Sequence, residues 1–381
     1  MDAEKLAILA EKTLEKDNSI MVVHQIINDY DLSRGGAQRI VRLLHTGLND
    51  DKFSSRLIGL SSSPTQELTQ AESFGFSSVY NWKIPFSLYR YFRKNVSEGD
   101  VVHAHLFPTV FHVSVLKQLG LLPTCTFIYT QHSTSNRRRN KWWGRMIDSI
   151  SYKAYDHIVG ISHGTTSSLL SWKPELEEKL LTINNGADLN FSEPISRKSS
   201  DCKLKILSVG RLHRSKNYAT AIRAIALIKD VDFEFQIAGI GPLQKDLMEL
   251  AKELKISDKV KFLGYVPDLS DTLRSADIFL LTSTWEGFGL AAVEAMNASL
   301  PCVLSDVIGL RELIQTDGHE GYLIDPENPQ EIAEKLKLLT ADLENRNRMG
   351  LLAFNRSKSY GVGEMIKKYT ELYKKELVGS Q

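Results

Sequence analysis

The stretch ADIFLLTSTWEGFGLAAVEAM, residues 276–296, contains a strand, a turn and a helix in immediate succession. Its apolar run predicts a buried β-strand, and residues 290–296 are strong helix formers. The turn between them carries Gly287 and Gly289, so we expect the helix to begin around Gly289. A helix N-terminus favours an anion, which makes this turn a candidate phosphate site. The backbone N–H groups expected to face a ligand are those of Phe288, Gly289 and Leu290.

Two carboxylates lie on either side of this turn. Glu286 precedes it, and Glu294 lies one to two turns down the expected helix, roughly 6 to 10 Å further along. Carboxylates accept hydrogen bonds from hydroxyl groups, so the pair would hold the sugar and ribose hydroxyls on either side of a diphosphate. A nucleotide sugar has that layout. The alternative is that Glu286 is a turn residue and Glu294 a solvated helix position.

The alternation of apolar runs and helical stretches recurs along the chain. Two such series predict an α/β fold with two doubly wound domains in tandem, each a parallel sheet covered by helices on both faces. A ligand is then expected in the cleft between the domains, where the strand C-termini converge. The apolar runs are residues 20–27, 54–60, 100–107, 125–131, 157–162, 205–210, 233–239, 259–264, 277–283, 301–305 and 321–325.

The polar stretch NFSEPISRKSSDCK, residues 190–203, interrupts this rhythm and predicts a linker at about residues 190–202. We therefore expect an N-terminal domain of residues 1–195 and a C-terminal domain of residues 203–356. Residues 1–16 have apolar positions at helical spacing and predict a surface helix.

Composition excludes several classes of partner. The 381 residues carry a formal net charge of +1, so no bulk field draws the chain to nucleic acid. No run of about 18 apolar residues predicts a membrane-spanning helix, and the N-terminus resembles no export signal, so we expect a cytoplasmic protein whose membrane contact is at most peripheral. The three cysteines have no metal-ligand spacing and predict reduced thiols. These are Cys125, Cys202 and Cys302.

Cations and glycines at the ends of other expected strands would complete a diphosphate site. Arg211 and Lys216, in SVGRLHRSKN, follow the first strand of the C-terminal half and are placed to neutralise a diphosphate. An isolated pair of this kind is more often surface charge. Gly239 closes the next strand, where a small residue lets a ligand approach the backbone.

The N-terminal half offers glycines and histidines at its strand ends. Gly35 and Gly36 predict a phosphate-facing loop, but the third glycine of a dinucleotide fingerprint is missing, which disfavours NAD. His132 and His105 also close strands, where an imidazole would donate to or accept from a substrate hydroxyl. Each histidine alone is more often structural. No set of histidines, cysteines and carboxylates has metal-site spacing, so no metal is expected.

Two stretches mix basic and aromatic residues: SNRRRNKWWGRM, residues 135–146, and NWKIPFSLYRYFRKN, residues 81–95. This composition suits an anionic bilayer or a lipid-phosphate acceptor, and the alternative is a solvated face with extended arginines. The residues expected to contact acceptor or membrane are Arg137, Arg138, Arg139, Trp142 and Trp143, together with His105.

Eight ordered segments between about residues 20 and 375 resemble the retaining glycosyltransferases of family four, which have the GT-B fold. They are GGAQRIV, HAHLF, TQHS, INNGADLNFSEP, VGRLHRSKN, AGIGP, FLGYVPD and EGFGLAAVEAM. The resemblance implies an acceptor-binding N-terminal domain, a nucleotide-sugar-binding C-terminal domain and a C-terminal helix, residues 357–381, that packs back on the first domain. Two residues depart from the common pattern, Gln131 and Ile308.

The resemblance also implies a role for each matching residue. Glu286 would bind the transferred sugar, Glu294 the ribose, and Arg211 and Lys216 the diphosphate, while His132 would lie near the sugar. The other donor-binding residues implied are Gly35, Gly36, Gly210, Gly239, Tyr265, Val266, Gly287, Phe288, Gly289 and Leu290.

The reaction implied is transfer of a glycosyl unit from a UDP- or GDP-sugar to an acceptor hydroxyl with retention of configuration and without a metal. A lipid-linked saccharide of bacterial surface polysaccharide biosynthesis, met at the inner face of the cytoplasmic membrane, is the acceptor we expect. A nucleotide-sugar epimerase, a phosphorylase and a noncatalytic nucleotide-sugar sensor remain alternatives.

Overall fold

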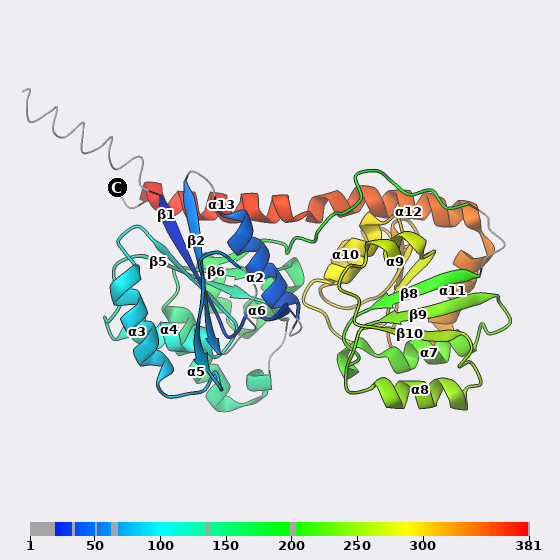
Figure 1. Ribbon diagram of the computed structural model, residues 1–381, viewed down its shortest axis with the longest axis horizontal. Helices are drawn as coiled ribbons and strands as arrows, with labels where there is room; N and C mark the ends of the chain where they lie inside the picture. The colour runs from blue at the N-terminus through cyan, green and yellow to red at the C-terminus, as the bar shows by residue number, and fades with distance from the viewer. Residues whose placement is uncertain are drawn as a thin grey trace, which may run out of the picture. The chain divides into compact units, whose positions relative to one another are not determined.

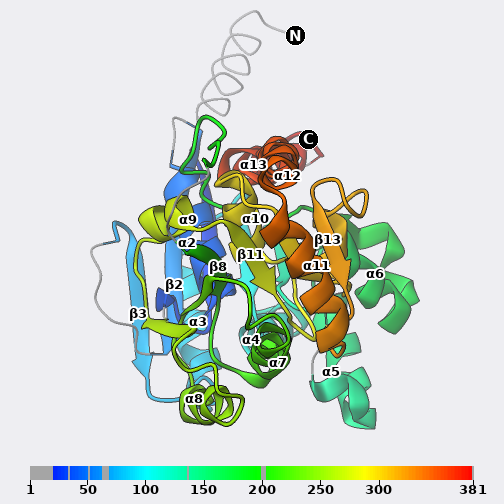
Figure 2. The same cartoon turned by 90° about the vertical axis from the view of Figure 1, so that its right-hand side faces the viewer.

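The chain folds into two compact units, each built around one parallel sheet (Figures 1 and 2). The computed structural model describes residues 20–32, 35–49, 52–61, 68–134, 137–198 and 203–379. The helix expected at residues 1–16 and Cys202 lie outside these ranges. The first unit comprises Met1–Gly160, Leu169–Ile183 and Ile366–Gln381, and the second comprises Ile161–Ser168 and Asn184–Met365.

The first unit has a seven-stranded sheet in the order β3-β2-β1-β4-β5-β6-β7, with every pair of neighbours parallel. Its strands are β1 (Met21–Ile27), β2 (Phe53–Ser61), β3 (Ala71–Phe76), β4 (Val101–His105), β5 (Thr126–Gln131), β6 (His157–Gly160) and β7 (Leu180–Thr182). Its helices are α2 (Gly36–Gly47), α3 (Ile84–Asn95), α4 (Thr109–Gln118) and α5 (Trp142–Lys153). Two further helices begin in the second unit and end in the first, α6 (His163–Trp172) and α13 (Val362–Gly379).

The second unit has a six-stranded parallel sheet in the order β10-β9-β8-β11-β12-β13. Its strands are β8 (Leu204–Val209), β9 (Phe233–Ala238), β10 (Val260–Gly264), β11 (Ile278–Leu281), β12 (Cys302–Ser305) and β13 (Gly321–Ile324). Its helices are α7 (Tyr218–Ala226), α8 (Gln244–Glu253), α9 (Ser270–Ser275), α10 (Leu290–Asn297), α11 (Pro329–Ala341) and α12 (Leu343–Ser357).

Both faces of the second sheet are buried. Ile278 and Leu280 of β11 belong to a core shared with α7, α8 and α11, whereas Phe279 and Leu281 belong to a core shared with α9, α10 and α12. Successive side chains of a strand point to opposite faces, so a strand with both faces covered is a continuous apolar run. Figure 1 shows α7 and α8 on one side of this sheet and α9 and α10 on the other.

Helix boundaries in the second unit follow local capping chemistry. The Asn328 side chain accepts a hydrogen bond from the Glu331 amide at 3.2 Å, and Pro329 occupies the first turn of α11. Asp342 ends α11 and caps α12 by accepting from the Asn345 amide at 2.9 Å. One polar residue therefore separates two helices that pack on the same core.

Each of the eleven expected apolar runs overlaps a strand, and the doubly wound α/β fold is confirmed. The expectation missed β3 and β7, which are the two edge strands of the first sheet. Their residues are mostly half-buried or exposed, so the sequence lacks the continuous apolar run of a central strand.

The described part of the expected linker is fixed to the second unit. The Phe191 amide donates to Asn297 Oδ1 at 3.0 Å and the Ile195 amide to Ser299 Oγ at 2.9 Å. The Arg197 guanidinium donates to three main-chain carbonyls, those of Ala276, Ala298 and Ser299. This segment therefore behaves as part of the second unit's surface, and residues 199–202 lie outside the described ranges.

Candidate functional site

The topology of the second sheet puts the candidate site at the carboxyl ends of β8 and β11. Strand β8 pairs with β9 on one side and with β11 on the other, so the direction in which strands are added to the sheet reverses at β8. A doubly wound sheet binds its ligand outside the carboxyl ends of the strands at such a switch point. The loops that leave β8 and β11 are the two that carry the predicted cations and carboxylate.

Hydrogen bonds to main-chain carbonyls join these two loops. Thr282 Oγ1 donates to the carbonyls of Lys216 and Asn217 at 3.1 and 3.0 Å. The Thr284 amide donates to the Ser215 carbonyl at 2.9 Å. The loops are therefore held edge to edge, and a side chain of one can meet a side chain of the other.

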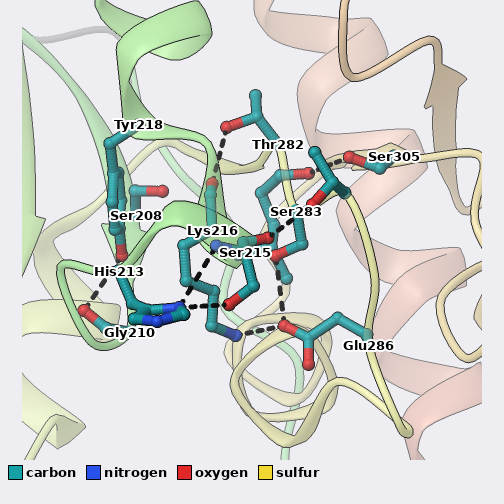
Figure 3. Close-up of polar contacts among 12 residues, drawn as sticks. Ser208, Gly210, His213, Ser215, Lys216, Tyr218, Thr282, Ser283, Glu286 and Ser305 are labelled. Carbon is teal, nitrogen blue, oxygen red and sulfur yellow. Dashed lines mark hydrogen bonds and ion pairs between the residues drawn. The ribbon is translucent and has the colours of Figure 1, made fainter. Parts of the chain in front are cut away.

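Lys216 and Glu286 form an ion pair between the two loops (Figure 3). Their side chains are 21% and 15% exposed, so the pair is largely buried but reachable from solvent. The Ser283 hydroxyl donates to the same Glu286 oxygen, Oε1, at 3.1 Å. The structure thus brings the predicted cation and acid together and adds Ser283, which the sequence did not single out.

The backbone at Gly289 turns sharply into α10. Gly289 has φ 88° and is the N-cap of the helix, and a Cβ there would lie 2.4 Å from Leu310 Cδ2. Only glycine adopts this conformation without strain in so narrow a space. Phe288 is 2% exposed and packs against Tyr360 with ring centroids 5.5 Å apart, which anchors the turn.

The carbonyl of Gly287 is fixed from α6 and the segment before it. Ser162 Oγ donates to it at 2.9 Å and Thr165 Oγ1 at 3.3 Å. Gly309 lies against the same loop, since a Cβ on Gly309 would be 2.5 Å from the Glu286 carbonyl. The sequence did not single out Ser162 and Thr165, because they lie more than a hundred positions from the motif along the chain.

Two glycines bring the ends of β8 and β9 close together. Gly239 has φ 148°, and a Cβ there would be 2.0 Å from the Gly210 carbonyl oxygen. Tyr218 also donates its hydroxyl to that carbonyl at 3.1 Å, and burial raises the Tyr218 pKa well above its ordinary value, with Glu286 adding to the rise. The phenol is therefore neutral and acts as a donor here.

The other predicted donor-binding residues of this unit differ in exposure. Arg211 is exposed at the end of β8, and Tyr265, which follows β10, is 58% exposed, whereas Val266 packs partly on the core. Glu294 is 6% exposed within α10, so it is not the solvated helix position that the alternative interpretation required.

In the first unit the switch point lies between β1 and β4. Gly35 is the N-cap of α2 with φ 152°, and Gly36 is the first residue of the helix. His105 ends β4 and is 0% exposed, so the structure gives it no surface for direct contact with an acceptor. Its Nδ1 lies 3.0 Å from Nε2 of His132, which is partly buried just after β5.

The basic and aromatic residues before and within α5 separate into two groups. Arg138 pairs with buried Asp148 at 3.0 Å and lies over the Phe107 ring, and Arg139 donates to the Thr134 carbonyl at 3.0 Å. The side chain of Arg137 lies outside the described part of the chain. In contrast, the side chains of α5's first residues reach solvent, with 80% exposure for Trp142 and 39% for Trp143.

Two further properties concern metals and membranes. Among the residues that the structure describes, no three His, Cys, Asp or Glu side chains form a group suited to a metal ion. No helix in the same residues is both long and apolar enough to cross a bilayer.

Two doubly wound parallel domains, with an acid, a cation and a helix N-terminus at a switch point, are the arrangement of the GT-B fold. Two family models match adjoining parts of the chain: Glycosyltransferase Family 4 over residues 34–191 and Glycosyl transferases group 1 over residues 192–356. The chain belongs to the group 1 glycosyltransferases and is therefore a glycosyltransferase.

Individual relatives agree with this assignment. An uncharacterized glycosyltransferase of Methanocaldococcus jannaschii is 31% identical over 258 residues, which is 62% of this chain and 65% of that protein. The N-acetylgalactosamine-N,N'-diacetylbacillosaminyl-diphospho-undecaprenol 4-alpha-N-acetylgalactosaminyltransferase of Campylobacter jejuni is 27% identical over 350 residues, covering 87% of this chain and 94% of the relative. The crystal structure of Anabaena HepE in complex with UDP is similar in fold, with TM-score 0.78, 17% identity, and coverage of 93% of this chain and 100% of that one.

Proposed function

We propose that this enzyme transfers a sugar from a UDP- or GDP-sugar to a hydroxyl of a lipid-linked saccharide, with retention of configuration and without a metal ion. The observation that carries the proposal is the Lys216–Glu286 pair beside the N-terminus of α10. A cation and a helix N-terminus favour a diphosphate, and a carboxylate next to them favours the hydroxyls of a sugar.

The chemistry needs charge stabilisation at the leaving group. Arg211 and Lys216 would bind the diphosphate, and the backbone N–H groups of Phe288 to Leu290 would face its oxygens or the sugar. The acceptor oxygen then bonds to the anomeric carbon on the face from which the diphosphate departs, as the sugar–phosphate bond breaks. The acceptor proton passes to the departing phosphate oxygen, and Glu286 positions the sugar.

The acceptor is inferred from chemistry and from a relative. The Campylobacter jejuni enzyme, which aligns over 94% of its length, is named for a saccharide on diphospho-undecaprenol. A lipid-linked acceptor of this kind, used in building a bacterial surface polysaccharide, requires the enzyme to work at a bilayer surface. We therefore propose peripheral contact with the inner face of the cytoplasmic membrane.

Exposed apolar side chains on and next to α3, α4 and α5 of the first unit support membrane contact. We refer to them together as the α3–α5 surface, and they include Trp82, Phe86, Leu119, Leu121, Trp142, Trp143, Met146 and Ile150, each at least 37% exposed. Gln118 at the end of α4 donates to the Ile150 carbonyl at 2.6 Å, which holds α4 against α5. Trp82 packs edge-on to Phe86 of α3. Exposed cations on α3 and α5 accompany them, namely Arg90, Arg93, Lys94, Arg145 and Lys153. Aromatic residues with interspersed cations suit an anionic bilayer.

Donor turnover tests the reaction. Purified enzyme is incubated with a panel of UDP-, GDP- and ADP-sugars in EDTA, and nucleoside diphosphate release is measured for wild type, Glu286→Gln and Arg211→Ala. We expect slow release from one donor in the wild type and loss in both variants, faster release with a lipid-linked acceptor, and a product of retained configuration. Release that requires added Mg²⁺ contradicts the metal-free proposal, and donor binding without turnover favours a sensor.

Flotation with vesicles tests the membrane contact separately. We expect the wild type to float with phosphatidylglycerol vesicles and not with phosphatidylcholine vesicles, because the α3–α5 surface combines apolar and basic residues. Trp82→Gln with Trp142→Gln should abolish flotation. The matched control is Leu338→Gln with Leu351→Gln, two exposed apolar residues of the second unit, which should float as wild type does. Equal flotation of the tryptophan variant and the control contradicts this surface.

A further inference from the structure

A chain of hydrogen-bonded side chains leads from the interior of the first unit to His132. Gln25 Oε1 lies 2.7 Å from His105 Nε2, and His105 Nδ1 lies 3.0 Å from His132 Nε2. Gln25 and His105 are both 0% exposed. We call these three residues the histidine chain. They come from β1, from the end of β4 and from the residue after β5, which are adjacent in the sheet.

The imidazoles of this chain are neutral. Burial lowers the pKa of His132 to about 3 and lowers the pKa of His105 well below its ordinary value, with nearby histidines adding to the effect on His105. A neutral imidazole has one N–H donor and one lone-pair acceptor. The tautomers of His105 and His132 are therefore linked, and the residue at one end of the chain determines both.

The amide of Gln25 sets the direction. An amide oxygen can only accept, so His105 carries its proton on Nε2 and its Nδ1 accepts from His132 Nε2–H. The Gln25 oxygen is the amide atom that faces His105, whereas the Gln25 amide nitrogen is buried and has no hydrogen-bond partner among the described residues.

The far end of the chain is His132 Nδ1, which is buried at the atomic level and has no hydrogen-bond partner among the described residues. With Nε2 protonated, Nδ1 holds a lone pair. We propose that Gln25 and His105 are positioning residues that fix His132 as the Nε2–H tautomer, so that Nδ1 accepts a hydrogen bond from a hydroxyl of the bound sugar or acceptor. Which molecule carries that hydroxyl rests on the function proposed above, whereas the tautomer of His132 does not.

A second set of polar side chains holds the histidine chain in place. His103 packs against His105 with ring centroids 4.1 Å apart and an angle of 40° between the rings, and its two nitrogens bond to Tyr373 at 2.8 Å and Thr130 at 2.7 Å. Thr130 also bonds to the Tyr369 hydroxyl at 3.0 Å. The two tyrosines belong to α13, so the C-terminal helix fixes the ring on which His105 rests.

Nitrogen NMR of the full-length protein tests the tautomer without any substrate. Protein labelled with ¹⁵N-histidine gives long-range proton–nitrogen correlations that distinguish protonated from unprotonated ring nitrogens, and His132→Gln assigns the resonances. We expect an unprotonated Nδ1 and a protonated Nε2 for His132 at neutral pH. A protonated Nδ1 overturns the proposal.

Removing the acceptor at Gln25 tests the positioning role. Gln25→Met keeps the length of the side chain, and we expect a mixture of His132 tautomers and a fall of up to about tenfold in kcat, since one neutral hydrogen bond contributes up to a factor of that size. KM for the donor should change little. The matched control is Gln236→Met, a buried glutamine on β9 of the second unit, which should leave the His132 signals and kcat unchanged.

The outcomes separate this inference from the proposed reaction. An unchanged tautomer in Gln25→Met, or a changed tautomer with unaltered kcat, overturns the positioning role. Absence of turnover in the wild type with every donor contradicts the proposed function, and the NMR result of the wild type still decides the tautomer.

Discussion

Neutralising Glu286 should separate the catalytic from the structural contribution of its ion pair. Glu286→Gln keeps the shape of the side chain, so the Ser283 and Lys216 contacts retain an acceptor oxygen while the negative charge is lost. The side chains of the pair are 15% and 21% exposed, which places it between a surface pair of about 0 to 1 kcal/mol and a fully buried pair whose disruption costs about 3 to 5 kcal/mol.

The expected stability loss is correspondingly intermediate. Solvent reaches both groups and the glutamine still accepts a hydrogen bond, so we expect the free energy of unfolding to fall by about 1 to 2 kcal/mol. The kinetic effect should be larger, because misplacing the sugar that Glu286 positions costs on the order of 10²-fold in kcat.

Denaturant unfolding and donor turnover measure the two effects on the same preparations. Glu234→Gln is the matched control, since Glu234 pairs weakly with Lys261 at 4.0 Å near the start of β9, away from the carboxyl ends of the strands. The control should keep wild-type kcat and nearly wild-type stability. Wild-type kcat in Glu286→Gln, or an equal loss in Glu234→Gln, would refute the assignment of Glu286 to the site.

Three further perturbations test the structure. Gly289→Ala should lower the free energy of unfolding by about 2 to 3 kcal/mol in urea, because φ is 88° and the new Cβ meets Leu310 at 2.4 Å, whereas Gly363→Ala meets no atom within 4 Å and should not destabilise. Arg197→Met should cost about 2 to 3 kcal/mol in the same measurement, because three carbonyls lose charged donors, while exposed Lys198→Met should be neutral. Acid should destabilise the first unit. Burial lowers the pKa of His132 from 6.5 to about 3, so between pH 6.5 and pH 3 the unfolded chain binds more protons than the folded chain, and the free energy of unfolding falls as the pH falls. His132→Gln should reduce that slope by about 1.4 kcal/mol per pH unit, and an unchanged slope would contradict the assignment of a neutral buried histidine.

The sequence predicted the central strands because burial on both faces leaves a visible pattern. Ile278 to Leu281 of β11 are all apolar since each side chain enters one of two cores. The edge strand β3, with the sequence AESFGF, has no such requirement and was missed. Burial therefore determined which elements could be predicted.

The candidate site was predictable in part for a related reason. Lys216 and Glu286 each follow a strand end, and the parallel topology brings such ends to one edge of the sheet. The residues that fix the Gly287 carbonyl, Ser162 and Thr165, lie more than a hundred positions away along the chain and have no distinctive local pattern. The inward direction of Arg138 likewise depends on Asp148 being buried, which a run of arginines does not reveal.

One topological rule accounts for the location of both polar sites. In the second unit, the switch point between β8 and β11 brings together the loops of Lys216 and Glu286. In the first unit, the switch point between β1 and β4 lies beside the histidine chain, whose members come from β1, β4 and the segment after β5. At a switch point the flanking helices diverge to opposite faces, so side chains at the carboxyl ends are not covered. A buried strand residue such as Gln25 can then act at that edge only through a partner nearer the surface, which is why His132 rather than His105 is the expected contact for a ligand.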